Sequence, residues 1–257
     1  MTDRTVAVVQ ARMSSSRLPG KVLMPLDGPP LIVFMLRRVA RARCIDEIVL
    51  ATSTDSSDDA LAEAVRAHGY AVHRGDLDDV LARYAGALQG RGARYAVRLT
   101  GDCPLVDPAV IDRVVQLLQR QSLAYVSNSD PPTFPDGLDV EAFTAEALFD
   151  AHAHARLPSE REHVTPYIRA HKQRYPQGVL RAPVDCSALR WTVDHADDLE
   201  VVRALVAGLP PGTAAQADLW DLLRVLDAHP ALASANCHTR NEGYAKSLAL
   251  DAQRAAA

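Results

Sequence analysis

The chain of 257 residues lacks the features of several large protein classes. Its four cysteines are scattered without Cys-x-x-Cys spacing, which argues against a zinc knuckle or a disulfide framework. No apolar run is long enough to span a bilayer, and the first residues hold no apolar signal core. Basic residues do not predominate, since 28 Lys and Arg against 32 Asp and Glu give a net charge of −4. We therefore expect a cytoplasmic protein that binds neither membranes nor nucleic acids.

Two familiar nucleotide-binding patterns are also missing. Gly20-Lys21 is followed by Val22 instead of Ser or Thr, and no glycine stands at the earlier position of a Walker loop. No Gly-x-Gly-x-x-Gly follows the first apolar run, and internal repeats are absent as well. A nucleotide site in this chain would therefore need a different loop.

The sequence does have the alternation of strand and helix patterns that is typical of an α/β domain. Hydrophobic residues make up 48% of the chain, enough for a substantial core. Apolar runs predict buried strands at 6–9, 47–51 and 95–99. Helical periods at 58–68 and 78–89 lie between them, and Asp107-Pro108 supplies the cap and first residue of another helix. The alternation predicts a mostly parallel, doubly wound sheet with helices on both faces.

The chain is expected to form a single domain, residues 1–257, with two halves. A stretch rich in proline and glycine, 128–137, interrupts the periodicity and separates the halves 1–128 and 129–257. In the second half we expect helical segments and two more strands, before a helical C-terminus. The expected elements are helices at 145–156 and 159–171 and strands near Val179 and Trp191.

A hydroxyl-rich, basic loop directly follows the first predicted strand. Small residues allow backbone N–H groups to approach an anion, and basic side chains supply the charge that a polyphosphate requires. The alternative is a basic surface turn. The residues expected to bind nucleotide in this loop are Gln10, Ala11, Arg12, Ser14, Ser15, Ser16 and Gly20, with Arg17 and Lys21 as catalytic candidates.

Other strand ends should meet this loop, because ligands bind beyond the carboxyl ends of strands in an open α/β sheet. Thr52 and Ser53 end the second predicted strand, where they could read a base or ribose. Gly101 and Asp102 end another, and the carboxylate is placed to hold a divalent cation and to take part in catalysis. The alternative for Asp102 is a cap on a turn.

The order of residues from Arg12 to Lys21 resembles the Arg-x-x-Ser-x-Arg-Leu-Pro-Gly-Lys signature of sugar-nucleotide cytidylyltransferases. In that family the loop grips the triphosphate of CTP. A second segment, 189–200, reads as a strand that ends in Asp194, and is similar to a Val-Asp-Thr-x-x-Asp-Leu-Glu segment of the 3-deoxy-manno-octulosonate class. That resemblance implies that Asp194 joins Asp102 on Mg²⁺. His195 replaces the usual threonine, so its role stays open.

The middle of the chain resembles a particular branch of that superfamily, the spore coat polysaccharide biosynthesis protein F branch. The segments that carry this resemblance are 51–53, 73–76, 79–84, 134–141, 160–165 and 241–244. It implies a Rossmann-like nucleotide-diphospho-sugar transferase fold with a smaller sugar-binding lobe. It also implies that residues 1–128 form the nucleotide-binding half and residues 129–257 the acceptor and dimerisation half. The implied homodimer forms through the 134–143 region.

Several further residues have both a functional and a plain interpretation. Arg74 faces a nucleotide or belongs to a turn, and Arg161 pairs with a substrate carboxylate or lies on a solvated helix face. His163 contacts substrate or takes part in salt bridging, and its spacing of three from Glu160 on a helix would also allow a metal site. Asp139 and Glu141 share one side of an extended segment and bind sugar hydroxyls or lie at a subunit contact.

Three further residues are expected to have structural roles. Asp197 and Asp198 are expected at the start of a helix rather than on a metal. Cys103 is expected to pack in the core, because the sequence supplies no neighbouring base that would activate it.

The hypothesis that joins these predictions is nucleotidyl transfer. A hydroxyl of a sugar or sugar acid attacks the α-phosphorus of CTP, Mg²⁺ assists, and pyrophosphate leaves. Another nucleoside triphosphate remains possible as the donor. Two alternatives stay open: a metal-dependent glycosyltransferase, although its usual Asp-x-Asp is absent at 102–104, and a nucleotide-binding protein without catalysis.

Overall fold

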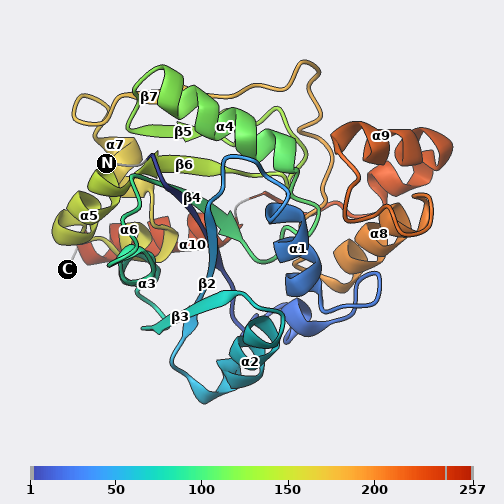
Figure 1. Cartoon of the computed structure of the whole chain (residues 1–257), viewed down its shortest axis with the longest axis horizontal. Coiled ribbons are helices and arrows are strands. Elements are labelled where there is room, and N and C mark those ends of the chain that lie inside the picture. Colours follow the sequence, from blue (N-terminus) through green and yellow to red (C-terminus); the bar gives the residue numbers. More distant parts are fainter. Residues whose placement is uncertain (1–2, 241, 256–257) are drawn as a thin grey trace.

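The computed structural model describes residues 3–240 and 242–255, which build three layers around one sheet (Figure 1). Among these residues the sheet has seven strands in the order β3-β2-β1-β4-β6-β5-β7, and β6 runs antiparallel to both of its neighbours. The strands are β1 (Thr5–Gln10), β2 (Glu47–Ser53), β3 (Ala71–Gly75), β4 (Tyr95–Thr100), β5 (Tyr125–Ser127), β6 (Glu141–Thr144) and β7 (Gln177–Val179). The predicted α/β fold with a mostly parallel sheet is confirmed.

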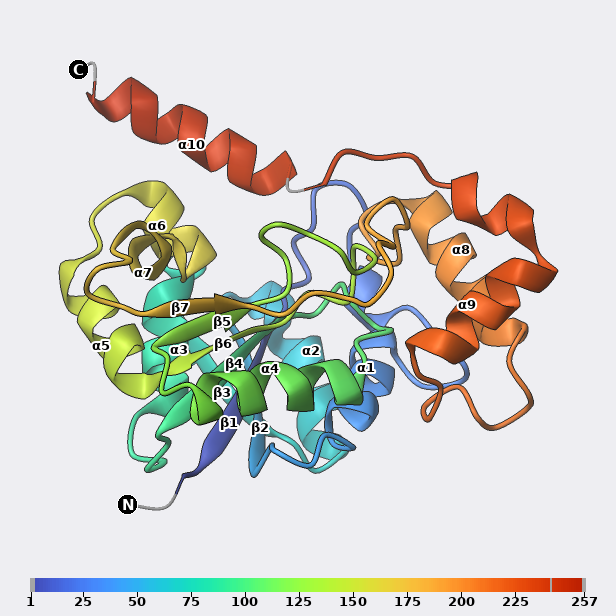
Figure 2. The same cartoon turned by 90° about the horizontal axis from the view of Figure 1, so that it is seen from above.

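Helices cover both faces of this sheet. One face carries α1 (Leu31–Val39), α2 (Asp59–Ala67) and α4 (Pro108–Arg120). The helices α8 (Ala196–Ala207) and α9 (Leu219–Ala228) extend the core of this face on the outer side of α1 (Figure 1). The other face carries α3 (Val80–Leu88), α5 (Ala145–His154) and α7 (Pro166–Ala170). Two further helices, α6 (Pro158–His163) and α10 (Glu242–Ala255), pack against each other, and Figure 2 shows α10 along the outer side of the molecule.

The central strand shows why a continuous apolar run was the correct signal for a buried strand. Val6, Ala7, Val8 and Val9 are all fully buried in β1. Ala7 and Val9 pack into the core on one side of the sheet, whereas Val6 and Val8 pack into the core on the other. Because successive side chains of a strand point to opposite faces, a strand covered on both sides has no position for a polar residue.

Local capping signals also have the expected structural effect. The Asp107 carboxylate accepts a hydrogen bond from the backbone N–H of Ala109 at 2.7 Å, and Pro108 is the first residue of α4, as predicted. The same side chain accepts the N–H of Leu219 at 2.8 Å. Asp107 therefore joins the start of α4 to the start of α9.

The prediction of a strand near Trp191 is wrong. The segment forms only an isolated bridge between Arg190 and Asp136. The N–H of Trp191 donates to the Asp136 carbonyl at 2.6 Å, while that of Val193 donates to the Asp102 carbonyl at 2.7 Å. Its backbone groups are thus bonded to two loops instead of a neighbouring strand. Gly137, at φ +107°, permits this close approach, since a Cβ there would lie 2.5 Å from the Thr192 nitrogen.

The single helix expected at 159–171 is instead two short helices, α6 and α7. Val164 between them has φ +71°, in the left-handed region, and Pro166 begins the second helix. The segment 128–137 is irregular, as predicted, but β5 precedes it and β6 follows it in the same sheet. The halves 1–128 and 129–257 therefore contribute strands to one continuous sheet.

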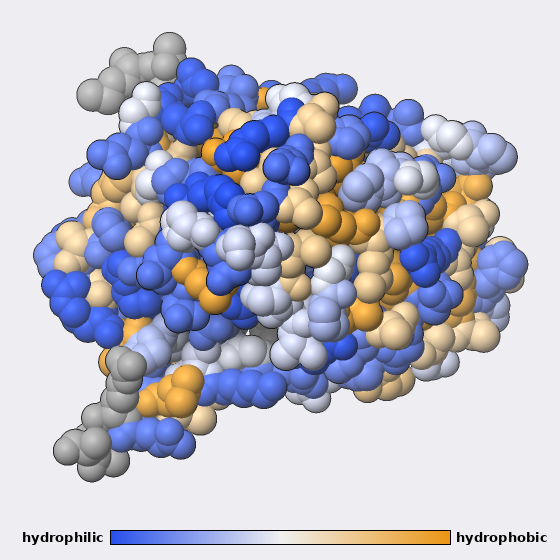
Figure 3. Space-filling model, turned by 90° about the horizontal axis from the view of Figure 1, so that it is seen from below, coloured by the Kyte–Doolittle hydropathy of each residue, from blue (hydrophilic) through white to orange (hydrophobic). Residues whose placement is uncertain are grey.

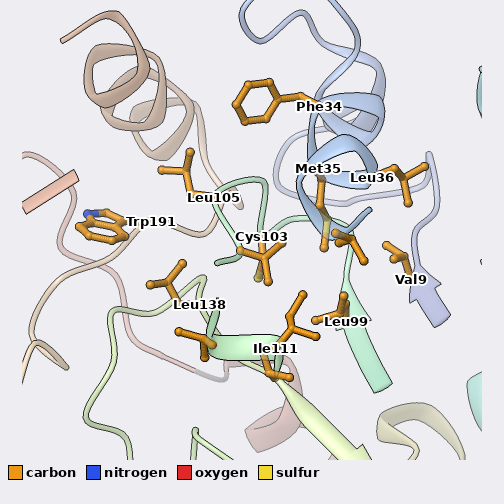
Figure 4. Packing of buried hydrophobic residues seen from close by; sticks show 14 of the residues in the cluster. Val9, Phe34, Met35, Leu36, Leu99, Cys103, Leu105, Ile111, Leu138 and Trp191 are labelled. Carbon is orange, nitrogen blue, oxygen red and sulfur yellow. The ribbon is translucent and has the colours of Figure 1, made fainter. Parts of the chain in front are cut away.

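Cys103 is buried in the apolar core. Figure 4 shows Cys103 among apolar side chains that include Leu99, Leu105 and Ile111, so its predicted packing role is confirmed. Burial raises the pKa of the Cys103 thiol well above its ordinary value. Hydrophilic and apolar residues are interspersed on the face drawn in Figure 3. No helix within the described ranges combines the length and apolar character needed to cross a membrane.

Candidate active site

Two adjoining cavities lie at the carboxyl ends of β1 and β4. The loop cavity, about 960 Å³, is lined by the loop after β1, the segment before α3, and parts of α6 and α10. The carboxylate cavity, about 510 Å³, is named for seven acidic residues in its lining: Asp102, Asp130, Asp136, Asp139, Glu141, Asp194 and Glu242. Both cavities share a boundary formed by Gln10, Arg17, Thr100, Asp102, His163, Asp194 and Gly243.

Most of the residues expected from the sequence reach one of these cavities. Those that line the loop cavity are Gln10, Ala11, Arg12, Ser15, Ser16, Arg17, Lys21, Gly101, Asp102, Arg161, His163 and Asp194. Asp139 and Glu141 line the carboxylate cavity. Five candidates line neither: Ser14, Gly20, Thr52, Ser53 and Arg74.

The loop after β1 is held by its own backbone and by one carboxylate. The N–H of Gly20 donates to the Met13 carbonyl at 3.0 Å, and Gly20 has φ +72°, a conformation that favours glycine. The N–H of Met13 donates to Asp58 at 2.7 Å. Gly20 thus shapes the turn that brings Lys21 into the loop cavity, although its own atoms do not line it.

The Lys21 side chain joins three chain segments at the boundary of the cavities. Its ammonium donates to Asp194 at 2.8 Å, to Asp102 at 3.2 Å and to the carbonyl of Val193 at 2.7 Å. Lys21 is 6% exposed. Burial disfavours the charged ammonium, but the two carboxylates outweigh burial and raise the pKa of Lys21.

Asp194 is the most strongly paired acid of the site. Besides Lys21, it accepts from Arg17 at 2.7 Å and from Arg190 at 3.2 Å. Burial opposes its ionisation, but Lys21 and Arg17 prevail and hold the pKa of Asp194 well below its usual range. Asp194 is therefore ionised at neutral pH.

Asp102 reaches the same point from β4 because Gly101 precedes it. The N–H of Gly101 donates to the Gln10 carbonyl at 2.8 Å. A Cβ at position 101 would lie 2.7 Å from the Ala11 Cβ, so a larger residue would push the two strand ends apart. The Asp102 and Asp194 carboxylates converge on one ammonium, and such a pair of oxygen donors fits a Mg²⁺ ion.

Asp198 has the helix-start role expected for it. Its fully buried carboxylate accepts the N–H groups of Asp194 and His195, both at 2.9 Å, at the start of α8. It also binds Arg190 at 2.9 Å and Asn236 at 2.8 Å. Asp198 thereby fixes Arg190, which in turn fixes Asp194.

Thr52 and Ser53 lie behind the loop rather than in a cavity. Both are fully buried, and their hydroxyls donate to Asp58 at 2.9 and 2.5 Å. Because Asp58 also holds the N–H of Met13, the pair supports the nucleotide loop from beneath. Arg74 donates to the Ser53 carbonyl at 2.7 Å and to Asp59 at 2.6 Å, which places it on the outer side of the same turn.

The candidates on α6 face the loop cavity. Arg161 pairs with Asp79, the cap of α3, and donates to the His152 carbonyl at 2.9 Å. His163 lies 2.9 Å from the Ser247 hydroxyl of α10 and contacts the Tyr244 ring edge-on. Arg161 is therefore close to the nucleotide loop and away from the carboxylate cavity.

Glu141 is fixed at the bottom of the carboxylate cavity. It pairs with Arg98 and accepts hydrogen bonds from Tyr125 at 2.5 Å and Thr165 at 2.6 Å. Burial disfavours the ionised carboxylate, but these partners outweigh burial and lower the pKa of Glu141. A bound sugar would meet a charged acceptor group in a fixed position.

Asp139 differs from Glu141 because its cationic partner does not outweigh the effect of burial on the pKa. Arg240 binds it at 2.6 Å, yet burial dominates and, with the nearby Asp136, raises the pKa of Asp139 to about 6. Asp136 is shared between Arg190, at 2.8 Å, and Arg240, at 3.6 Å. The cavity thus contains one acid that titrates close to neutral pH.

This raised pKa leads to a testable pH dependence. Since folding raises the pKa of Asp139 above its ordinary value near 3.8, its contribution to stability is complete below about pH 4 and is lost as the pH rises through 6. In urea unfolding from pH 4 to 7, Asp139→Asn should gain stability relative to the parent chain across this window. Asp227→Asn, on the exposed side of α9, should show no such gain. A constant difference between Asp139→Asn and the parent at all pH values would contradict the assignment.

Four arginines and one tyrosine of the site were not identified from the sequence. Arg98 and Arg190 line the carboxylate cavity beside Arg169, and Tyr244 of α10 lies with its ring 5.7 Å from the Arg169 guanidinium carbon. Arg83 lines the loop cavity, and within the described part of the chain its Nε has no hydrogen-bond partner. Arg98 could have been identified from the sequence, because it is a charged residue that interrupts an apolar strand four residues before Asp102. Asn241, the first residue of the segment 241–244 that contributes to the family resemblance, lies outside the described residues.

Comparisons with known proteins agree with this geometry. The spore coat polysaccharide biosynthesis protein SpsF of Bacillus subtilis is 34% identical over 88% of this chain and 95% of that protein. A 3-deoxy-manno-octulosonate cytidylyltransferase of Syntrophobacter fumaroxidans is 39% identical, with 79% of this chain and 97% of that protein covered. A solved cytidylyltransferase from Leptospira borgpetersenii superposes with a TM-score of 0.85, at 29% identity, over 92% of this chain and 99% of that one.

The family relationship extends over the part of the site that precedes residue 200. The model of the cytidylyltransferase family matches residues 6–199, which include the loop after β1, Asp102 and Asp194. This match covers more than half of the chain. The chain therefore belongs to the cytidylyltransferase family.

Proposed function

We propose that this protein transfers CMP from CTP to a sugar or sugar acid, with release of pyrophosphate, in the biosynthesis of a surface polysaccharide or glycoconjugate. The observation that carries the proposal is the convergence of Lys21, Asp102 and Asp194 at the boundary of two cavities. A reaction between two substrates needs two binding sites that meet at the reacting atoms. Membership in the cytidylyltransferase family and the similarity to SpsF support the same reaction.

The nucleotide is assigned to the loop cavity. Arg12, Ser15, Ser16 and Arg17 line it, and they offer hydrogen-bond donors and positive charge for the triphosphate. Arg83 adds a further guanidinium to the lining. Positioning and charge neutralisation by these groups would supply most of the catalysis, because an in-line displacement at phosphorus requires no covalent intermediate with the protein.

The acceptor is assigned to the carboxylate cavity. Its carboxylates can accept hydrogen bonds from sugar hydroxyls, as ionised acids are acceptors only. Among the described residues Arg169 has one ionic partner, the exposed Asp130 at 3.0 Å. Its guanidinium is therefore the group we assign to the carboxylate of an acidic acceptor. The acceptor hydroxyl would meet the α-phosphorus at the shared boundary, beside Gln10 and Thr100.

Asp102 and Asp194 would hold Mg²⁺ at that boundary. When bound, the ion would neutralise charge on the α-phosphate and lower the pKa of the attacking hydroxyl. Arg190 would keep Asp194 in place through its contact at 3.2 Å, and Gly101 would keep Asp102 close to the nucleotide loop. Asp102 has no such second cation among its described contacts, which leaves it available to the ion.

The proposal is tested by pyrophosphate release. CTP, UTP, GTP and ATP are each incubated with a set of sugars and sugar acids, with Mg²⁺ or with EDTA. We expect release that depends on CTP, on one acceptor and on the divalent cation. Consumption of a sugar nucleotide without pyrophosphate release would instead identify a glycosyltransferase, and CTP binding without turnover would identify a protein without catalysis.

We further propose that the protein acts in the cytoplasm as a homodimer. The apolar side chains expected at the dimer contact, Phe134, Leu138, Val140 and Phe143, are fully buried within the chain. A dimer through the 134–143 region would therefore use polar and backbone groups. Sedimentation equilibrium at micromolar concentration should give twice the mass of the chain, and a monomer would contradict the assignment.

A further inference from the structure

The ammonium of Lys21 lies where the two proposed metal ligands converge. It is bound to Asp194 at 2.8 Å and to Asp102 at 3.2 Å, and these carboxylates lie 173 and 81 residues away along the chain. The Val193 carbonyl, 2.7 Å away, completes a set of three oxygen acceptors around one cation. Oxygen atoms that converge on one point are also what a divalent cation requires.

Cations already pair with both carboxylates in the nucleotide-free protein. Lys21 binds Asp102 and Asp194, and Arg17 and Arg190 also contact Asp194. A divalent cation that entered alone would compete for oxygens already bound, and would lie close to a buried ammonium of the same sign. A complex of a divalent cation with a triphosphate carries a net negative charge instead, because the phosphates hold more negative charge than the ion neutralises.

The Lys21 ammonium has a second position available, in the loop cavity. Its side chain lines the loop cavity together with Arg12, Ser15 and Ser16, where the triphosphate is assigned. A lysine carries its charge on a flexible four-carbon stem, so the ammonium can change partners while the backbone stays in place. The backbone itself is fixed by the short helical turn Lys21–Leu23 and by Gly20 before it.

We propose that Lys21 excludes the divalent cation from Asp102 and Asp194 until the triphosphate draws its ammonium into the loop cavity. The metal ion can then enter only together with the nucleotide. Lys21 thus does two things in turn: it holds the two carboxylates together in the empty enzyme and binds phosphate in the loaded one. This inference rests on the proposed use of a divalent cation at these two residues.

The experiment measures Mn²⁺ binding in the absence of nucleotide, by the electron paramagnetic resonance signal of free Mn²⁺. Lys21→Met and Lys21→Gln should bind Mn²⁺ at least tenfold more tightly than the parent chain. Mn²⁺ should also raise the melting temperature of both variants while leaving that of the parent unchanged. Lys172→Met, an exposed lysine outside both cavities, is the matched control and should bind Mn²⁺ like the parent.

Two further measurements make the result specific. Adding Asp102→Asn to the Lys21→Gln chain should remove the gained Mn²⁺ affinity, because one of the two ligands is then neutral. Lys21→Gln retains hydrogen-bond donors, so it keeps the test valid if Lys21→Met fails to fold. Equal Mn²⁺ affinity of the parent and both Lys21 variants, including no binding by any of them, would overturn the inference. Pyrophosphate release by the parent is measured separately, so its failure would count against the proposed function alone.

Discussion

Asp102→Asn should reduce kcat for pyrophosphate release by about 10³-fold, the scale of losing one preorganised electrostatic contact to the reacting group. The asparagine keeps an oxygen that can accept from Lys21 at the position now 3.2 Å away, so the fold should persist. Its neutral amide, however, is a poor ligand for a divalent cation compared with a carboxylate. The measurements are initial rates with saturating CTP and Mg²⁺, together with the melting temperature.

The matched control for this prediction is Asp227→Asn, which removes an exposed carboxylate of α9 outside both cavities. It should leave rate and melting temperature unchanged. An Asp102→Asn chain with a normal rate would remove Asp102 from the metal site. A lost rate accompanied by an equally large loss of stability would show that Asp102 acts through the fold and not on the substrate.

Arg38→Met should lower the free energy of unfolding by about 4 kcal/mol, because hydrogen bonds from a charged donor are each worth about 1.5–3 kcal/mol and are not additive. Arg38 of α1 is fully buried and donates to the carbonyls of Leu105, Val106, Ala214 and Ala217 at 2.7–3.1 Å. Methionine keeps the apolar stem and leaves four carbonyls without this donor. Burial lowers the pKa of Arg38 to about 10, so it is charged at neutral pH.

The neighbouring residue provides the control. Arg37→Met, on the exposed side of the same helix, should change the unfolding free energy by no more than about 0.5 kcal/mol. Both variants are compared by urea unfolding at pH 7. Equal stability of Arg38→Met and the parent chain would mean that the four carbonyls find other partners.

Arg38 also illustrates what a sequence pattern leaves out. It lies in the run Leu31–Val39, where helical periodicity allows a polar residue on an outer face. The structure buries it because the 105–106 loop and the 214–217 segment, far apart in the chain, both present carbonyls to α1. No spacing within α1 contains that information.

The residues near Thr52 show the same limit within the site. Their place at the end of β2 was predictable, since it depends on an apolar run and on the parallel order of strands. The hydrogen-bond partner of their hydroxyls was not predictable. Asp58, five and six residues further on, turns back and accepts both hydroxyls, which removes them from the cavity.

The sequence by itself determined the α/β fold, the basic loop after β1, the cap of α4, and the position of Asp102 at the end of β4. Each of these depends on signals within a few residues: apolar runs, Asp-Pro, and glycine beside charge. Only the tertiary structure decided that segment 189–193 is not a strand, that Arg161 pairs with Asp79, and that Lys21 lies between Asp102 and Asp194. Those outcomes depend on contacts between residues up to 173 positions apart, which packing and charge pairing select and local periodicity does not encode.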